Sequence, residues 1–337
     1  MLWLERALKT IMSEAIVPLS QAEIVAPPPD APLDSMDAFE WFLQIDVANG
    51  DATRDTVNAY RREVGAWVKW CENNGIEVLY ATRDHIELFR ESLKNRGLTV
   101  KTRQFKLSIV RRFYDAAVRH NLIEKNPATG VRAGKDLTAP EDNMKALGLG
   151  ALGQLVAAIP GDTLSGARDR AIVGLMALHG LRRIEVHRLN HESLQNIEEG
   201  EPYLEVEGKG TKNRRVYLRA DTLATLEAYA HAKFAAELPL EGAFFVAHGN
   251  NGRGGRLSRQ ALNQIVDKHL GAATLKRAGV SCHALRHTFG TLSVAGGAKI
   301  EHLRDAMGHS KIDTTSIYVR AVERAKNNPS NFIDVEI

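Results

Sequence analysis

The chain has 337 residues, of which 44% are hydrophobic and 25% are charged, a composition typical of a globular protein with about two domains. Its net charge of +3 at pH 7 neither favours nor excludes a polyanionic partner, because charge can be concentrated in one part of a chain. Two cysteines are too few for a disulfide framework, and no apolar run is long enough to span a membrane, so we expect a cytoplasmic protein without membrane contact.

Residues 1–34 differ from the rest of the chain in charge and in proline content. They contain two basic and five acidic residues, and they end in the proline-rich stretch 26–32. A proline cluster cannot sustain a helix and favours an extended spacer. We therefore expect an N-terminal extension or tether, which is either a short amphipathic helix or disordered.

Residues 35–130 predict a domain of four helices without a strand. Apolar residues recur at spacings of three and four, which is the period of a helix. Threonines at 53, 82 and 99 stand where helices begin, and glycines at 75, 97 and 130 stand where they end. The aperiodic segment 131–145 that follows is the expected linker.

Basic residues are concentrated in the second half of this helical region. The 27 residues from Lys94 to His120 hold eight basic side chains and one acidic side chain, Asp115. A solvated helix face is one explanation, although exposed helices usually mix both signs. We favour a surface that contacts a phosphate backbone.

Residues 146–325 mix helices with strands. The apolar run 171–178 predicts a buried helix that stops at Gly180, a second helix is expected from about Arg183, and residues 221–236 predict a further helix. The segments 203–206 and 215–218 predict a β-hairpin whose turn carries basic residues. A short strand is expected at 243–246, and helices are expected from His283 onward.

Several kinds of reaction centre are absent from the sequence. There is neither a phosphate loop of the nucleotide hydrolases nor a His-Glu-x-x-His zinc motif. Cys282, His283 and His287 lie close together, but three candidate ligands without a fourth are weak support for zinc. We expect no metal ion and no other cofactor.

Residues that can carry chemistry gather in the second region. His283 and Arg286 are three positions apart and share a helix face, His309 follows a glycine, and Tyr318 comes nine residues later. A lone helical tyrosine usually packs in a core, and a histidine after glycine usually belongs to a helix end. Two upstream residues complete the set: Arg182 and Lys209.

This set of residues suits attack on a phosphodiester. It consists of two arginines, two histidines, one lysine and one tyrosine. Guanidinium groups can hold the non-bridging oxygens, on which negative charge develops, through bidentate hydrogen bonds. Donors placed in advance stabilise the transition state without a metal ion. A tyrosine oxygen can form a covalent intermediate, and a lysine or histidine can protonate the leaving oxygen.

The order and spacing of these residues resemble those of the tyrosine recombinases, the phage integrase family, and in particular its Xer-like recombinases and integrases. The motifs are GLRRIEV at Arg182, GKGTKNR at Lys209, HALRH, MGHS and Tyr318. The resemblance covers about residues 35–325. It implies a mainly α fold with a small antiparallel sheet. An all-α, SAM-like core-binding domain at 35–130 and a linker at 131–145 precede a mixed α+β catalytic domain at 146–325 and a tail at 326–337.

By this resemblance, Arg182 and Arg286 clamp the scissile phosphate, and His283 and His309 hydrogen-bond it and assist proton transfer. Tyr318 is the nucleophile and forms a 3′-phosphotyrosine, which stores the bond energy so that rejoining needs no ATP. Lys209 is the general acid for the 5′-hydroxyl, with Lys212 of the same loop as the alternative. The expected DNA contacts are Lys101, Arg103, Lys106, Arg111, Arg112, Lys212, Arg214 and Arg215.

One position, Arg183, departs from the family pattern, whereas a histidine at position 287 is common in it. Arg183 stands where a small or polar residue is usual, but Arg182 is the one placed three residues before Glu185, which can orient it. His287, beside Arg286, is expected to be structural rather than catalytic.

The resemblance predicts site-specific strand exchange on double-stranded DNA, in integration, excision or replicon dimer resolution. The working unit is a tetramer of this chain or an assembly with a related recombinase. A type IB topoisomerase-like enzyme and a non-catalytic DNA-binding relative remain alternatives. Cleavage that persists in EDTA would exclude a metal-dependent nuclease.

Overall fold

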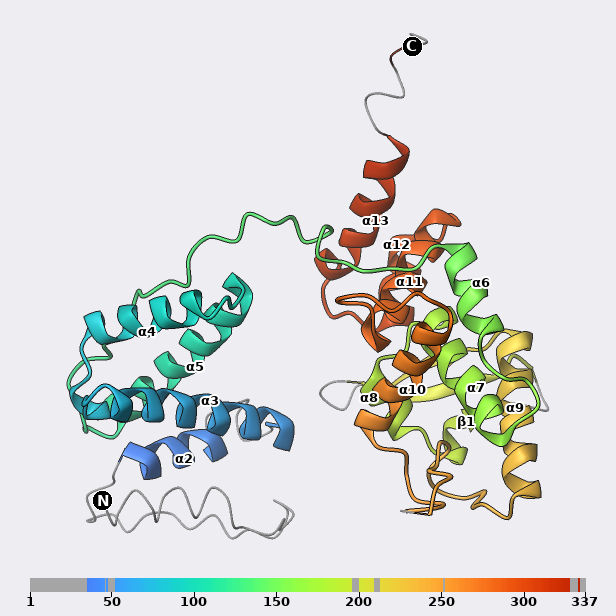
Figure 1. Ribbon diagram of the computed structural model, residues 1–337, viewed down its shortest axis with the longest axis horizontal. Coiled ribbons are helices and arrows are strands. Elements are labelled where there is room, and N and C mark those ends of the chain that lie inside the picture. Colours follow the sequence, from blue (N-terminus) through green and yellow to red (C-terminus); the bar gives the residue numbers. More distant parts are fainter. Residues whose placement is uncertain are drawn as a thin grey trace. The chain divides into compact units, whose positions relative to one another are not determined.

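The computed structural model of the chain describes residues 35–45, 47, 52–195, 200–208, 213–250, 252–327 and 333. It divides into two compact units, Met1–Leu137 and Thr138–Ile337 (Figure 1). The division falls within the segment 131–145, and the exact domain limits stay a prediction. The extension predicted at residues 1–34 lies outside the described residues, as does most of the predicted tail.

The described part of the first unit is all helical. Its elements are α2 (Ser35–Ile45), α3 (Arg54–Asn73), the short 3-10 helix η2 (Val78–Tyr80), α4 (Arg83–Asn95) and α5 (Val100–Arg119). Thr53 and Thr99 cap α3 and α5, since each side-chain oxygen accepts a hydrogen bond from the backbone N–H three residues later.

An aromatic cluster fills the core of the first unit. Trp67 on α3 is fully buried and packs edge-to-face on Phe89 and Tyr114, with ring centroids 4.9 and 6.3 Å away. Its indole N–H donates to the Tyr114 hydroxyl at 3.1 Å, and that hydroxyl donates to the Val78 carbonyl at 2.7 Å. The two bonds satisfy these buried polar groups and tie α3, α5 and η2 together.

The second unit is built around α7 (Leu164–Leu178), which is buried on most of its circumference, as expected for a central helix. α7 packs against α9 and α11. The helices of this unit besides α7 are α6 (Leu149–Ala157), α8 (Arg183–Arg188), the 3-10 helix η3 (His191–Ser193), α9 (Ala220–Ala235), α10 (Arg259–Ala272), α11 (Cys282–Ala295), α12 (Ile300–Met307) and α13 (Asp313–Lys326).

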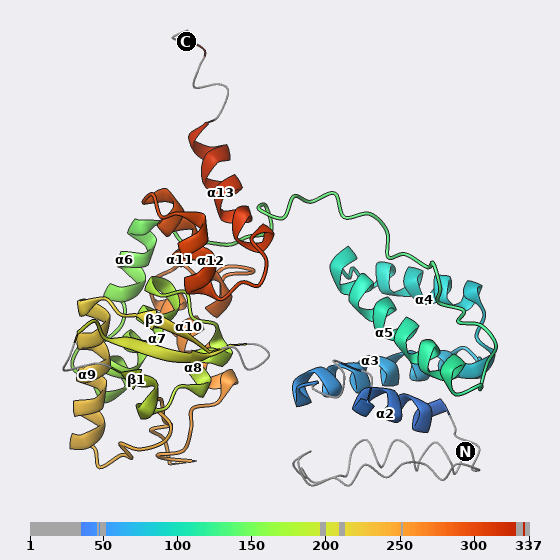
Figure 2. The same ribbon diagram turned by 180° about the vertical axis from the view of Figure 1, so that it is seen from behind.

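A three-stranded antiparallel sheet lies beside these helices (Figure 2). Its strands, in order, are β1 (Leu194–Gln195), β2 (Tyr203–Glu207) and β3 (Asn213–Tyr217). Val206 pairs with Arg214, and Leu204 pairs with Val216, on the face that is turned inward. Arg215 lies on the opposite, exposed face. β2 contacts α8 and β3 contacts α12, so the hairpin borders two segments that carry predicted catalytic residues.

The strand predicted at 243–246 is wrong. Ala243 and Val246 make only isolated bridges, to Asn190 and Arg256. Phe244 and Phe245 between them are buried. The hydrophobicity of this run therefore reflects packing in the core rather than a ladder of strand hydrogen bonds.

The predicted fold class is confirmed. An all-α unit precedes a unit in which helices surround a small antiparallel sheet, and the predicted hairpin is present. Within the described ranges, no helix is both long enough and apolar enough to cross a bilayer.

Replacing Tyr114 with phenylalanine tests the core of the first unit. Trp67 and Val78 would lose a buried partner, so we expect a loss of about 1–3 kcal/mol in the free energy of unfolding. All four tryptophans lie within residues 1–70, so tryptophan fluorescence during urea unfolding reports on this unit. Tyr80→Phe, at a position 75% exposed, is the control and should leave the midpoint unchanged. An unchanged midpoint for Tyr114→Phe would contradict the assigned hydrogen bonds.

Candidate active site

Helix α11 places a buried guanidinium at the centre of the site. Arg286 is 2% exposed, and it donates to the carbonyls of Gly180 and Met307, the latter at 2.6 Å. It also donates to His309 Nε2 at 2.8 Å. Desolvation and then repulsion from Arg182 lower the pKa of Arg286 to about 10, so the group is still charged at neutral pH.

Arg182 is held by Glu185, one turn later in the chain. Gly180 supplies the turn between α7 and α8, with a φ of 67°, and a Cβ there would lie 2.3 Å from the Phe289 ring. Arg182 Nη1 and its backbone N–H each donate to a different oxygen of Glu185, both at 2.7 Å. Nη2 donates to the Gly308 carbonyl at 3.1 Å. The Arg182 side chain is 33% exposed, so this guanidinium is the more accessible of the two.

The tautomer of His309 follows from its partners. Gly308 ends α12 in the left-handed conformation and delivers His309 to the site. Arg286 has only donors, so His309 Nε2 accepts, and Nδ1 carries the proton that it donates to Thr315 Oγ1 at 2.9 Å. Desolvation, followed by Arg286 and Arg182, lowers the pKa of His309 to about 4. The ring is therefore neutral at pH 7.

Tyr318 on α13 is 1% exposed. Its ring lies parallel to that of His309, with centroids 6.5 Å apart, and it covers Gly290, where a Cβ would lie 2.6 Å from the ring. Its hydroxyl is 3.1 Å from His287 Nδ1. Desolvation raises the pKa of Tyr318, and the charges of Arg286 and Arg182 oppose that rise. The phenol is thus protonated at neutral pH and held in one orientation.

Two histidines stand one turn apart on α11. The rings of His283 and His287 meet edge-to-face, with centroids 4.4 Å apart. Desolvation, followed by His283 and Arg286, lowers the pKa of His287 to about 4. His283 is exposed as a whole residue, yet its ring is enclosed enough for desolvation, then Arg286 and Arg182, to lower its pKa. The contact with Tyr318 makes His287 part of the site.

Five of the six predicted catalytic residues thus come together from α11, α13 and the turns before α8 and after α12. The sixth, Lys209, and its alternative, Lys212, lie outside the described residues. Strands β2 and β3 flank that loop, and β3 contacts α12. The choice of general acid stays a prediction.

The predicted DNA contacts on α5 differ in their surroundings. Lys101 and Arg112 are exposed. Arg103 is 9% exposed, Lys106 pairs with a buried glutamate of α3, and Arg111 donates to two backbone carbonyls after α5. Two of the five side chains are therefore exposed, although Lys101 lies 4.0 Å from Asp136, and the other three are at least partly buried.

The two predicted contacts on β3 lie on opposite faces of the hairpin. Arg215 is exposed, and its guanidinium carbon lies 4.9 Å from the centroid of the Tyr203 ring. The Arg214 side chain is only 13% exposed, on the inward face. A position in the protein interior gives Arg214 different partners from those of Arg215.

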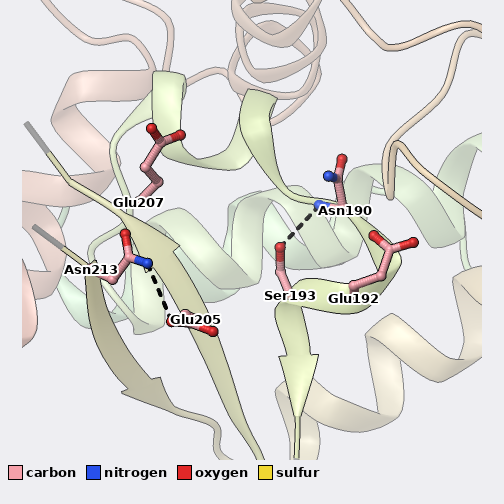
Figure 3. A pocket seen from close by; sticks show the side chains of 6 residues that line it. All are labelled: Asn190, Glu192, Ser193, Glu205, Glu207 and Asn213. Carbon is pink, nitrogen blue, oxygen red and sulfur yellow. Dashed lines mark hydrogen bonds between the residues drawn. The ribbon is translucent and has the colours of Figure 1, made fainter. Parts of the chain in front are cut away.

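A cavity of about 460 Å³ opens on the exposed side of the hairpin (Figure 3). It is lined by Asn190, Glu192, Ser193, Glu205, Glu207 and Asn213. None of the predicted catalytic residues lines it, and its three carboxylates would repel a phosphate. The predicted catalytic residues therefore lie away from this cavity.

The cysteine beside His283 is a packing residue. Cys282 is buried, and desolvation raises the pKa of its thiol to about 12. Among the residues that the structure describes, no three His, Cys, Asp or Glu side chains are grouped to hold a metal ion.

Sequence reasoning missed Thr315 and Gly290, and it predicted a DNA contact for Arg214 without its position in the interior. Thr315 orients His309, and Gly290 leaves room for Tyr318, but no local pattern marks either of them. The position of Arg214 could have been found. The period of two along a strand puts it on the same face as Val216, inside the protein.

We predict that His287 and His309 stay neutral from about pH 5 to about pH 8, because their folded pKa values are about 4. NMR titration of ring carbon shifts checks this, with His287→Asn and His309→Asn to assign the signals. Unfolded histidines bind protons near pH 6.5, so these residues also reduce the free energy of unfolding as pH falls from 6.5 towards 4. A titration midpoint near 6.5 for either ring in the folded protein would contradict the assigned contacts.

Two family models match the chain. The phage integrase family matches residues 151–324, and the N-terminal SAM-like domain of phage integrases matches residues 42–121. The first match contains every residue of the site described above, and the second contains most of the helical first unit.

Named relatives agree with this match. The tyrosine recombinase XerC of Xanthomonas campestris pv. campestris is 30% identical over 315 residues, which are 91% of this chain and 92% of that protein. XerD of Bifidobacterium longum is 29% identical over 294 residues, 83% of this chain and 90% of that protein.

Solved structures show the same fold. The XerH site-specific recombinase bound to palindromic difH substrate has a TM-score of 0.69 at 18% identity, covering 88% of this chain and 84% of that one. A lambda integrase dimer bound to a COC′ core site has a TM-score of 0.64 at 16% identity, covering 86% and 78%. The chain belongs to the phage integrase family and is a Xer-like tyrosine recombinase.

Proposed function

We propose that the chain is a site-specific recombinase that cuts and rejoins DNA strands through a 3′-phosphotyrosine on Tyr318. The observation that carries this proposal is the convergence of two arginines on one histidine and one buried tyrosine. Arg286 is bonded to His309, and His309 lies parallel to Tyr318. Arg182 is close enough to lower the pKa of Arg286.

The two arginines are the proposed clamp for the scissile phosphate. The Arg286 guanidinium stays charged at neutral pH although it is buried, and the buried carboxylate of Glu185 holds the Arg182 guanidinium. Negative charge that develops on those oxygens during attack is stabilised by guanidinium donors already in place. His283 and His309 add neutral hydrogen-bonding groups at the edge of the clamp.

In the proposed reaction, the Tyr318 oxygen forms a bond to phosphorus as the bond from phosphorus to the 5′-oxygen breaks. The phenol proton passes to a nearby imidazole, and His287 Nδ1 is the nitrogen already in contact with the hydroxyl. Lys209 supplies the proton for the leaving 5′-oxygen. A 5′-hydroxyl of another strand then reverses these steps, so no external energy source is required.

Tyr318 is buried in the structure, and the reaction therefore requires that α13 shift when DNA binds. Only 1% of the side chain is exposed, and a scissile phosphate is too large to reach the hydroxyl without such a movement. The ring packs with Leu303 and Met307 and closely against Gly290, so the movement has to break these contacts.

Double-stranded DNA is the proposed substrate, and a tetramer is the proposed assembly. Solved relatives of the same fold include XerH bound to difH and a lambda integrase tetramer bound to a Holliday junction. Four copies of this chain, or this chain with a related recombinase, would supply the four tyrosines of complete strand exchange.

We place the protein in the cytoplasm, where such DNA is accessible. The relatives named above are recombinases, so a topoisomerase role is not favoured.

Tyr318→Phe should abolish the covalent protein–DNA adduct and leave folding and DNA binding intact, because it removes the nucleophilic oxygen and almost no volume. Denaturing gels of protein incubated with the host's genomic DNA in EDTA provide the measurement. Tyr217→Phe, which removes a hydroxyl from a side chain that is 56% exposed, is the matched control and should form the adduct normally. An adduct in Tyr318→Phe would show that another residue is the nucleophile.

The two loop lysines can be separated by changing the leaving group. Lys209→Ala should cleave slowly, and a substrate with a 5′-thiolate leaving group should partly restore the rate, because a thiolate needs little protonation. Lys212→Ala should show no such selective rescue. If the thiolate substrate rescued only Lys212→Ala, Lys212 would be the general acid. If it rescued neither variant, the general acid would lie outside this loop.

A further inference from the structure

Arg214 lies in the protein interior although it is the third basic residue in a loop-and-strand segment rich in positive charge. It pairs with Val206 across the hairpin, and its side chain is 13% exposed. It lies across Gly308, where a Cβ would come within 2.9 Å of Arg214 Nη1. The φ of 62° favours glycine at the position before His309, and any side chain there would also displace the Arg214 guanidinium.

Each nitrogen of the Arg214 guanidinium has a protein partner. Nη1 and Nη2 donate to the two oxygens of Glu185, both at 2.9 Å, and Nε donates to the Ala306 carbonyl at 3.0 Å. This is a bidentate pair with a carboxylate whose side chain is only 2% exposed. To contact a DNA phosphate, Arg214 would have to break its bidentate pair with the buried Glu185 carboxylate.

Glu185 joins Arg214 to the predicted clamp. Each of its oxygens accepts one bond from Arg214 and one from Arg182. Desolvation alone would raise the pKa of Glu185, but hydrogen bonds and charge from Arg214, with smaller contributions from Arg182, lower it overall. The carboxylate that orients Arg182 thus stays ionised largely because of Arg214.

Three arginines also meet at the end of α12. The carbonyls of three successive residues there each accept from a different arginine: Ala306 from Arg214, Met307 from Arg286, and Gly308 from Arg182. His309 comes next in the chain. The C-terminal end of a helix carries partial negative charge, which favours cations at this turn. Arg214 is the member of this trio that connects the turn to β3.

We propose that Arg214 is a positioning residue for strand cleavage, which orients Arg182 through Glu185 and fixes the turn that carries His309. It also anchors the end of the predicted general-acid loop, because β3 begins at Asn213, directly after residues 209–212. The proposal rests on the recombinase function proposed above. It replaces the direct DNA contact that the sequence suggested for Arg214.

The test compares saturating cleavage rate with DNA affinity. The probe is a duplex recovered from the covalent complexes that the unmodified protein forms on the host's genomic DNA, and cleavage is measured in a single turnover. Arg214→Lys keeps the charge without the bidentate geometry, and Arg214→Met keeps much of the volume. The control is Arg219→Met, at an arginine two residues after β3 that is not among the predicted DNA contacts and whose side chain is 62% exposed.

We expect both Arg214 variants to cleave roughly 100-fold more slowly at saturating DNA, with little change in half-saturating concentration, because misplaced groups cost rate rather than binding. Arg219→Met should keep the normal saturating rate. An Arg214→Met protein with the normal saturating rate and much weaker, less salt-dependent binding would identify a DNA contact and overturn the proposal.

A second substitution separates positioning from stability. Arg214→Met leaves Glu185 with one cationic partner, so the unfolding midpoint of this variant should be lower than that of the unmodified protein. Adding Glu185→Gln removes the buried charge and should restore much of the midpoint. Cleavage should stay slow in that double variant, because Arg182 remains unoriented. Recovery of cleavage along with the midpoint would reduce Arg214 to a structural role and overturn the proposal.

The two proposals fail in different ways. If the unmodified, folded protein forms no adduct on any DNA, the proposed function is overturned, and the positioning role with it. If the unmodified protein forms the adduct and Arg214→Met forms it at the same rate, only the positioning role is overturned.

Discussion

One buried carboxylate, Glu185, determines how the charged groups of the site can be arranged. Arginines brought close together repel each other, and Glu185 offsets that repulsion while accepting four hydrogen bonds from Arg182 and Arg214. Removing one partner from such a buried pair typically costs about 3–5 kcal/mol, because the remaining charge is left uncompensated. With Arg286 included, three guanidinium groups face one carboxylate, so the site keeps the excess positive charge that a phosphodiester requires.

Burial keeps the histidines neutral and the tyrosine protonated, and nearby positive charge reinforces the first effect and opposes the second. Desolvation, followed by His283 and Arg286 for His287 and by the arginines for His309, lowers both pKa values to about 4, so both rings present nitrogens that can accept hydrogen bonds. His309 uses this property to hold Arg286, and His287 uses it to contact the Tyr318 hydroxyl. Tyr318 is protonated and buried, so the proposed cleavage depends on a movement of α13 when DNA binds.

Much of this arrangement could be predicted from the sequence, for identifiable reasons. Helical periodicity placed the first unit, and the alternating hairpin pattern placed β2 and β3, because both periods are local properties of the chain. The spacing of His283, Arg286, His309 and Tyr318 indicated the candidate site.

Other features could not be predicted from the sequence. The run at 243–246 was wrongly predicted to be a strand, because core packing and strand formation select the same apolar residues. The two-residue strand β1 and the short helix α6 were too small to leave a pattern. The roles of Thr315 and Gly290 depend on contacts between segments, which no local pattern encodes.

The central claim is that this set of residues delivers the Tyr318 oxygen to a DNA phosphate. The most direct measurement is mass spectrometry of the peptide that stays attached to DNA after covalent complexes formed in EDTA are digested with a protease and a nuclease. The account predicts one modified peptide from α13, with a nucleotide 3′-phosphate joined to Tyr318. A nucleotide on another residue, a 5′-linked nucleotide, or the absence of any adduct from active, folded protein would contradict it.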